Sequence, residues 1–494
     1  MSKSTKSFRP KARRPKGLED RYGVQAAAET ALIAAASSVY AAHGFVPLAT
    51  PALEYADCLG KFLPDDDRPN DGVFAFTDDD AQWLALRYDL TAPLARFVAQ
   101  NYDRLPKPLR RYAAGPVWRN EKPGPGRFRQ FIQVDADTVG APGTAADAEM
   151  VMLAADVMDA AGLQRGEYII RINNRKLLDA VLDGIGVPGS DAGALQRLRV
   201  LRAIDKLDRL GETAVAQLLG AGRKDASGDF TQGAGLDAKG IEAVLAFTRA
   251  GAGTLDATLA ALEPLMGVSA TGAEGLAELR AIAALLAAGG YDDGRTGIDP
   301  SVVRGLGYYT GPVFEADLRL QTLNEKGQPV RFGSAGGGGR YDDLIARFRG
   351  QKVPATGFSF GVSRFAAALA ALGRSGDAAT GPVVVLALEP EQMAAYFAMA
   401  QELRDGGICA EVYMGGSGMR AQMKYADKRG APAVVIAGED ERAKGAVTVK
   451  NLVLGQKLSG EIKDNRQWRE GRPAQVTGPR GELLALVRAA LAEG

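Results

Sequence analysis

Two strand-like stretches that meet across a turn rich in glycine and proline constrain the fold most. They lie within residues 109–140, and the turn between them, residues 122–126, has the sequence KPGPG. Side chains alternate along a strand with a period of two, so Arg119 and Glu121 share one face of the first stretch. A five-residue turn places Arg119 opposite Arg129. The matching face of the second stretch carries Arg127, Arg129, Phe131, Gln133, Asp135 and Asp137.

The residue types on this face indicate a class of ligand. Arginines, an aromatic ring, an amide and two carboxylates suit a polyanion with a planar ring together with a small zwitterion. A nucleotide and an amino acid fit that description. The simpler alternative is an amphipathic hairpin whose polar face meets only solvent, which is a common arrangement in antiparallel sheets.

Composition excludes several classes of protein. A chain of 494 residues is long enough for two or three domains, and its net charge of +1 gives no overall field that would attract nucleic acid. Cys58 and Cys409 lie far apart without metal-binding spacing, and a single histidine, His43, rules out an HExxH metalloprotease motif. No stretch approaches the roughly 20 apolar residues of a membrane span. We therefore expect a cytoplasmic protein with no membrane partner.

Changes in composition along the chain indicate its domains. Residues 1–16 are basic without an acidic residue or an apolar run, so we expect a disordered tail that contacts phosphates rather than a secretory signal. Residues 17–372 are expected to form the main domain, and residues 373–381, GRSGDAATG, have linker composition. Residues 382–494 alternate short apolar strands with helices, which predicts an α/β domain with a largely parallel sheet.

The main domain is predicted to contain a helical insertion. Residues 190–290 are rich in Ala, Leu and Gly, with leucines at helical spacing and basic residues interleaved among them. A basic face of this kind is more often solvated, although an insertion that faces RNA would have the same pattern.

Two further segments carry candidate ligand-binding residues. Asp89 and Thr91 lie where a strand enters a helix, so they either bind an ammonium group or cap the helix. Arg304 is followed by glycines and by Tyr308 and Tyr309, which allows backbone and rings to approach a ligand closely.

The sequence contains no P-loop, GxxxxGK[ST], so arginines must hold the phosphates of any bound ATP. The glycine-rich SAGGGGRYDDL, residues 334–344, is weak evidence for a nucleotide by itself. Arg119, Arg304 and Arg364 are the candidates for phosphate contacts.

Five motifs resemble those of a known family. GFVPLATPALE (residues 44–54), the hairpin with RNE and GRFRQF, and GFSFGVSRF (residues 357–365) resemble motifs 1, 2 and 3 of class II aminoacyl-tRNA synthetases. RGLGYYTGPVFE (residues 304–315) and GGGGRYDDL (residues 336–344) resemble the two signature segments of histidyl-tRNA synthetases. The C-terminal strand pattern resembles the anticodon-binding domain of the same family.

The resemblance implies a fold and an activity. The fold would be an α+β catalytic domain built on an antiparallel sheet, with a helical insertion and a C-terminal α/β anticodon-binding domain. Motif 1 would form a homodimer interface. ATP would activate L-histidine to histidyl-adenylate, and the histidyl group would then pass to the 3'-hydroxyl of the terminal adenosine of histidine tRNA. Mg²⁺ would bind mainly through the ATP phosphates, with no protein metal site.

The resemblance also implies roles for individual residues. Arg304 and Arg119 would be catalytic, with Arg304 between the substrate carboxylate and the α-phosphate. The residues implied for ATP are Arg119, Glu121, Arg127, Phe131 and Arg364. Those implied for histidine are Asp89, Thr91 and Gln133 at the α-ammonium, and Asp137, Tyr308 and Tyr309 at the imidazole.

Two other functions remain as alternatives. One is a catalytically silent paralogue that binds histidine as a signal; such proteins usually lack the anticodon domain and lose the ATP arginines, which are present here. The other is a class II enzyme for a different amino acid, such as prolyl, threonyl or glycyl. The two signature segments argue against it.

Overall fold

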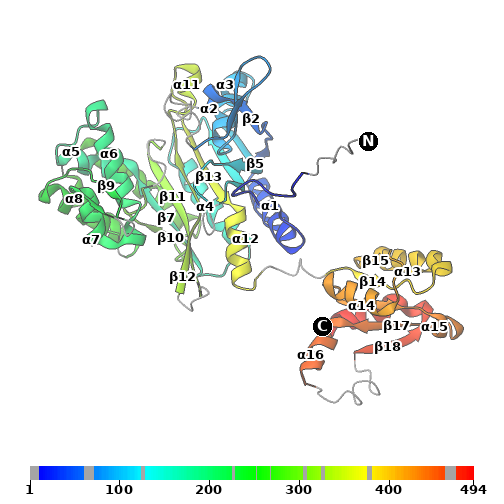
Figure 1. Ribbon diagram of the computed structural model, residues 1–494. Coiled ribbons are helices and arrows are strands. Elements are labelled where there is room, and N and C mark those ends of the chain that lie inside the picture. The colour runs from blue at the N-terminus through cyan, green and yellow to red at the C-terminus, as the bar shows by residue number, and fades with distance from the viewer. Residues whose placement is uncertain are drawn as a thin grey trace. The chain divides into compact units, whose positions relative to one another are not determined.

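The computed structural model describes residues 10–59, 72–123, 128–224, 228–251, 253–267, 269–303, 309–323, 329–374, 381–461 and 474–493. The chain forms two compact units, residues 1–374 and residues 375–494 (Figure 1). The division falls inside the segment expected to be a linker. Within the described ranges, no helix is long and apolar enough to cross a membrane.

A sheet of eight strands organises the first unit. Its order is β1-β5-β6-β13-β12-β11-β7-β10. The six central strands pair antiparallel, and only the outermost pairs, β1 with β5 and β10 with β7, are parallel. The antiparallel sheet that the resemblance implies is confirmed. The strands are β1 (Val46–Pro47), β5 (Leu109–Trp118), β6 (Gln130–Val139), β7 (Tyr168–Asn174), β10 (Thr296–Ile298), β11 (Pro312–Leu323), β12 (Pro329–Arg340) and β13 (Ala355–Gly361).

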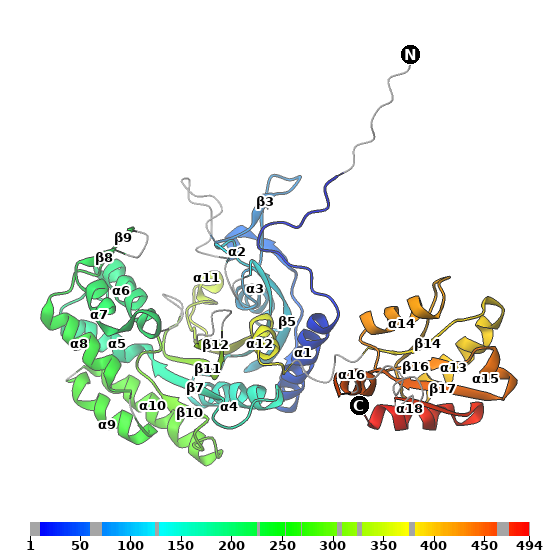
Figure 2. The same cartoon turned by 60° about the horizontal axis from the view of Figure 1, so that its bottom comes forward.

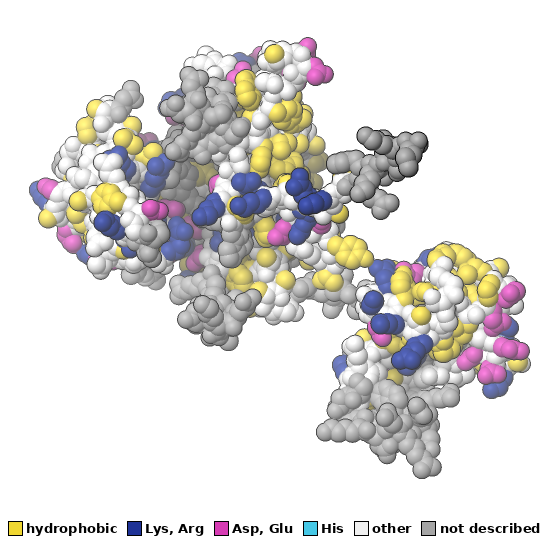
Figure 3. All heavy atoms as spheres, in the orientation of Figure 1, with side chains coloured by type: hydrophobic (Ala, Val, Ile, Leu, Met, Phe, Trp, Pro, Cys, Tyr) yellow, Lys and Arg dark blue, Asp and Glu magenta, His cyan; other side chains and the backbone are white. Residues whose placement is uncertain are grey.

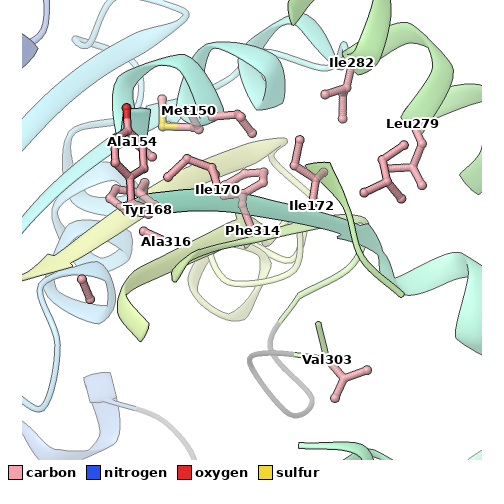
Figure 4. Packing of buried hydrophobic residues seen from close by; sticks show 14 of the residues in the cluster. Met150, Ala154, Tyr168, Ile170, Ile172, Leu279, Ile282, Val303, Phe314 and Ala316 are labelled. Carbon is pink, nitrogen blue, oxygen red and sulfur yellow. The ribbon is translucent and has the colours of Figure 1, made fainter. Parts of the chain in front are cut away.

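Helices bury one face of this sheet. They are α1 (Val24–Ala42), α4 (Ala145–Ala160) and α12 (Val362–Ala371). Figure 4 shows Met150 and Ala154 of α4 facing Tyr168 and Ile170 of β7, with Phe314 of β11 beside them. Since strand side chains alternate, the residues between these apolar positions point to the opposite face of the sheet. That opposite face carries the polar residues of β6 and β13.

The hairpin has the register predicted from its turn. Leu109 of β5 pairs with Val139 of β6, and the pairing continues to Trp118 with Gln130. One step further, the Arg119 amide donates to the Arg129 carbonyl at 2.9 Å. The expected juxtaposition of Arg119 and Arg129 is confirmed.

The segment after α1, which contains the motif 1 residues, consists of short elements. It divides into β1, β2 (Leu53–Tyr55) and the short helix α2 (Ala56–Leu59). Pro51 lies between the strands and has no amide hydrogen to donate to a ladder, which explains the break. β2 joins a separate three-stranded sheet, β2-β4-β3, with β3 (Ala75–Thr77) and β4 (Trp83–Leu86).

The insertion is helical, as its composition predicts, and it also contains a small hairpin. β8 (Gly222–Lys224) pairs with β9 (Phe230–Gln232), and strands of three residues are too short to show a pattern in sequence. Helix α5 packs against α8 and α10. The helices of this region are α5 (Arg175–Gly184), α6 (Asp191–Ile204), α7 (Leu207–Leu219), α8 (Ala238–Arg249), α9 (Leu255–Met266) and α10 (Ala270–Ala288), which Figure 2 shows together beside the sheet. The remaining helices of this unit are α3 (Thr91–Asn101) and α11 (Ala346–Arg349).

The second unit has a five-stranded sheet of order β15-β14-β16-β17-β18. β14 pairs parallel with β15 and β16, but β17 pairs antiparallel with β16 and β18. The prediction of a largely parallel sheet was therefore wrong for two of the four strand pairs. Only residues 437–445 join β16 to β17, too few for the crossover that parallel strands require. The strands are β14 (Val383–Val385), β15 (Ala410–Val412), β16 (Ala433–Ile436), β17 (Ala446–Asn451) and β18 (Gln475–Pro479). The helices are η2 (Pro390–Gln392), α13 (Met393–Asp405), α14 (Met419–Lys428), α15 (Glu439–Ala443), α16 (Leu452–Glu461), η3 (Arg480–Glu482) and α18 (Leu483–Ala492).

Candidate active site

A cavity of about 530 Å³ opens on the polar face of the large sheet. Eight of the residues predicted for the site line it: Asp89, Thr91, Arg119, Glu121, Phe131, Gln133, Tyr309 and Arg364. Three others, Arg127, Arg304 and Tyr308, lie outside the described residues. Asp137 is described but does not line the cavity.

One part of the cavity wall is cationic and aromatic. The Arg119 guanidinium lies 5.1 Å from the centre of the Phe131 ring, and its Nε donates to the Tyr88 carbonyl at 3.3 Å. Arg364, in the first turn of α12, donates from Nη2 to the Phe332 carbonyl at 2.8 Å. The contact of Arg119 Nε with the Tyr88 carbonyl leaves other hydrogens of this guanidinium for a ligand, because an arginine has five N–H donors.

Another part of the wall consists of hydrogen-bond acceptors. Gln133 Nε2 donates to Ser359 Oγ at 2.7 Å, while its buried Oε1 has no hydrogen-bond partner within the described part of the chain. Asp135 is 2% exposed, and neither of its carboxylate oxygens has a partner among the described residues. Buried acceptors are normally satisfied, so these oxygens are positioned for donors from a ligand. An ammonium group and an imidazole N–H supply such donors.

Asp89 contributes to the acceptor wall and also caps a helix. Its Oδ1 accepts hydrogen bonds from the Thr91 amide at 3.1 Å and from the Ala92 amide at 2.9 Å, at the start of α3. Capping therefore operates, and the second carboxylate oxygen can still accept a hydrogen bond from a ligand.

The protonation of Asp135 is sensitive to its surroundings. Burial, and to a smaller extent the nearby Asp137 carboxylate, raise the pKa of this carboxyl to about 7, while the Arg111 guanidinium and the Ser359 side chain act to lower it. At neutral pH, both protonation states of the side chain are therefore populated.

Asp137 lies behind the cavity wall. Its Oδ2 is 2.7 Å from Arg111 Nη2, and its Oδ1 accepts a hydrogen bond from the Tyr341 hydroxyl. Arg111 is the residue opposite Asp137 in the β5–β6 register, and it is 1% exposed. The Asp137 carboxylate is thus engaged inside the protein, whereas that of Asp135 faces the cavity.

Glycines in β12 and β13 allow the strands to form this wall. A Cβ atom on Gly336 would lie 2.6 Å from the Ser359 carbonyl oxygen, and one on Gly357 would lie 2.1 Å from Asp137 Oδ1. Both distances are shorter than any real Cβ contact. The glycine run therefore reflects close packing of strands as well as access to the cavity.

Several side chains that line the cavity are absent from the predicted set, and three of them are informative. Asp135 lies on the predicted polar face, but the resemblance selected Asp137 two residues further on. Ser359 and Phe128 line the cavity without belonging to the predicted set. The alternation of side chains along the strand could have identified Asp135. Ser359 could be identified only once it was known that this residue pairs with Asp135 on the neighbouring strand.

The architecture and the site together define a class of protein. An antiparallel sheet carries, on its polar face, a cavity with arginines for phosphates and acceptors for an amino acid, and the sequence has no P-loop. This is the arrangement of a class II aminoacyl-tRNA synthetase. Within the described ranges, no cluster of His, Cys, Asp and Glu side chains could hold a metal ion.

Similarity to known proteins identifies the family to which the chain belongs. The histidyl-tRNA synthetase family pattern matches residues 17–365, and that of an anticodon-binding domain matches residues 382–468. The chain is 58% identical over 483 residues to a histidine–tRNA ligase of Caulobacter vibrioides, which covers 97% of both chains. It is 58% identical over 486 residues to that of Brucella ovis, covering 98% of this chain and 96% of the relative. The crystal structure of a histidyl-tRNA synthetase from Nostoc sp. superimposes with a TM-score of 0.74 at 26% identity, covering 97% of this chain and 100% of that one. The chain belongs to the histidyl-tRNA synthetase family.

Proposed function

We propose that the chain attaches L-histidine to histidine tRNA in two steps at this cavity. The histidine carboxylate attacks the α-phosphate of ATP, which gives histidyl-adenylate and releases pyrophosphate. The 3'-hydroxyl of the terminal adenosine of the tRNA then takes the histidyl group and releases AMP. The observation that carries the proposal is the combination of residues that line one cavity, with the cations Arg119 and Arg364 alongside the acceptors Asp89, Gln133 and Asp135.

The cationic part suits the nucleotide. Arg119 would contact the α-phosphate, where charge develops during the first step, and Arg364 would contact the outer phosphates. Phe131 would stack on the adenine ring, and Glu121 would accept a hydrogen bond from its amino group. Arg127 would join Arg364, and Mg²⁺ would bind through the phosphates rather than through protein carboxylates.

The acceptor part suits the amino acid. Asp89, Thr91 and the free Gln133 Oε1 would receive the α-ammonium. Asp135 and Tyr309 would face the imidazole. Asp137, the sequence-based choice for the imidazole, would instead hold the wall through Arg111 and Tyr341, and Arg304 and Tyr308 would complete the site from the adjoining segment.

A homodimer is supported by apolar side chains that are exposed around motif 1. Val46, Leu53, Tyr55, Phe76 and Trp83 are all exposed on β1 and the three-stranded sheet. Several large apolar side chains exposed on neighbouring short strands are typical of interaction sites. Light scattering should give the mass of two chains, and Tyr55→Asp should shift it toward one; a monomeric wild-type protein would refute the dimer.

The direct test of the function is tRNA charging. Each of the twenty amino acids, radiolabelled, is incubated singly with the protein, ATP, Mg²⁺ and a histidine tRNA transcript. Label should enter the tRNA with histidine only. Charging with another amino acid, or with none, would overturn the proposal.

A further inference from the structure

Positive charge is concentrated at the start of the chain. The first sixteen residues carry seven lysines and arginines and no acidic residue; since the whole chain has a net charge of +1, residues 17–494 carry a net charge of −6. Within residues 10–16, which we call the basic arm, Lys11, Arg13, Arg14 and Lys16 are all exposed. The acids that follow, Glu19 and Asp20, are exposed too, and the ion pair between Arg14 Nε and Asp20 Oδ2 is long at 3.9 Å.

The basic arm is anchored where it meets the motif 2 hairpin. The Gly17 carbonyl accepts a hydrogen bond from the Arg129 amide at 2.9 Å, and Arg129 Nη1 donates to the Lys16 carbonyl at 3.5 Å. Gly17 has a φ of +79°, and a Cβ atom there would lie 2.8 Å from Arg129 Cδ and 3.2 Å from Pro123 Cβ. A glycine is therefore required both for the backbone conformation and for the close approach to the hairpin.

A second contact fixes the chain four residues later. Arg21 Nε lies 2.7 Å from Glu29 Oε1 in a pair that is almost fully buried. The Arg21 guanidinium also donates to Ser363 Oγ at 3.3 Å and lies 5.7 Å from the centre of the Phe128 ring. Separate contacts at Gly17 and at Arg21 thus fix the chain immediately after the basic arm.

These anchors place the basic arm beside the mouth of the cavity. Arg129 follows Phe128 in the chain, and Phe128 and Glu121 line the cavity on the two sides of the hairpin. Figure 3 shows lysine and arginine side chains gathered on this face of the first unit. A polyanion whose end enters the cavity would have its backbone next to the arm.

We propose that the basic arm binds the phosphates of the tRNA acceptor stem while the 3'-end lies in the cavity. The proposal rests on the function proposed above, which brings that end to the α-phosphate. Lysines and arginines that contact phosphates release counterions. For each contact, log K for binding therefore falls by about 0.7 to 0.9 for every tenfold rise in salt concentration. The arm supplies an otherwise acidic chain with a positive surface at the position where the tRNA end must enter.

A matched pair of double variants tests this proposal. Arg13→Ala with Arg14→Ala removes two charges from the basic arm, and Arg104→Ala with Lys107→Ala removes two exposed charges beyond the opposite end of β5. Binding of histidine tRNA, and of a minihelix that contains only its acceptor stem, is measured between about 50 and 200 mM salt. The slope of log K against log salt is negative. The arm variant should reduce its magnitude by about 1.5 for both RNAs, and the control variant should reduce it by much less.

A third variant and a reaction without tRNA separate the possible results. Gly17→Ala keeps every charge but clashes with Arg129, so it should weaken binding of the minihelix. Histidine-dependent ATP–pyrophosphate exchange should remain at the wild-type level in the arm variant. Equal slopes for the two double variants, an effect on whole tRNA without one on the minihelix, or an equal loss of exchange would each overturn the proposal. Absence of exchange in the wild-type protein would instead refute the proposed function.

Discussion

Two aspartates of one strand illustrate how surroundings decide the role of a side chain. Asp135 and Asp137 lie on the same face of β6, but Asp137 is paired with Arg111 and Tyr341 inside the wall, while Asp135 lines the cavity and has no hydrogen-bond partner among the residues that the structure describes. Removal of one member of a buried ion pair leaves an uncompensated charge, whereas removal of an unpartnered carboxylate does not. Substitutions at the two positions should therefore have different consequences.

Asp135→Asn should weaken the binding of histidine and leave the binding of ATP almost unaffected. A hydrogen bond to a charged group is typically worth about 1.5 to 3 kcal/mol, which corresponds to a rise of roughly 10- to 100-fold in the KM for histidine. Asp137→Asn should instead lower the free energy of unfolding by about 3 to 5 kcal/mol, because it leaves Arg111 buried without its partner. Exchange kinetics and urea unfolding of both variants measure the two effects. A rise in the histidine KM confined to Asp137→Asn would restore Asp137 as the imidazole-binding residue.

The raised pKa of Asp135 also predicts a dependence of stability on pH. The folded-state pKa of about 7 exceeds the ordinary value of 3.8, so the folded protein binds this proton more tightly than the unfolded chain does. Stability from this group is complete below about pH 4 and is lost as the pH rises toward about 7, by an amount on the order of 2 to 4 kcal/mol. The charged or titratable groups that act electrostatically on Asp135, or on which it acts, are Tyr40, Arg87, Asp89, Arg111 and Asp137.

Unfolding of the wild-type protein and Asp135→Asn at about pH 5 and about pH 8 tests this dependence. The variant should gain stability relative to the wild-type protein at the higher pH. A stability difference that stays constant across this range would contradict the assignment.

At the scale of elements, a buried ion pair joins α4 to the sheet. Arg340, at the end of β12, donates to Asp147 Oδ2 from Nε at 3.0 Å and from Nη2 at 2.5 Å, and both side chains are buried. Asp147→Asn should lower the free energy of unfolding of the catalytic unit by about 3 to 5 kcal/mol. Asp343→Asn, which breaks an exposed pair with Lys352, should cost less than about 1 kcal/mol. Similar losses in the two variants would show that α4 is not fastened through this pair.

Elements with a strong local pattern could be predicted from the sequence, and those fixed by distant pairing could not. The register of the β5–β6 hairpin followed from its turn length and from the alternation of its side chains. The antiparallel direction of β17 and the short strands β8 and β9 depend on partners elsewhere in the chain. At the site, the face of Asp135 could be predicted, but which of two neighbouring carboxylates lines the cavity was decided by Arg111 on the next strand.

At the scale of the whole molecule, the two units divide the proposed work. The cavity lies wholly within residues 1–374, and each unit has buried clusters of its own. A fragment ending at Arg374 should therefore keep histidine-dependent ATP–pyrophosphate exchange close to that of the full chain, while tRNA charging falls by at least about tenfold through lost binding energy. Exchange and charging rates measured on the same preparation check this. Parallel loss of both, in a fragment with native circular dichroism, would show that the second unit supports the cavity itself.

The most direct test of the central claim is amino-acid-dependent ATP–pyrophosphate exchange without tRNA, with the wild-type protein and Arg119→Ala compared. The cavity should support exchange with histidine alone among the twenty amino acids. Loss of Arg119 should lower the rate by roughly 10²- to 10³-fold, the usual effect of removing one donor to developing charge. Exchange with a different amino acid, or histidine binding without any exchange, would contradict the assignment of this cavity as the site of histidine activation.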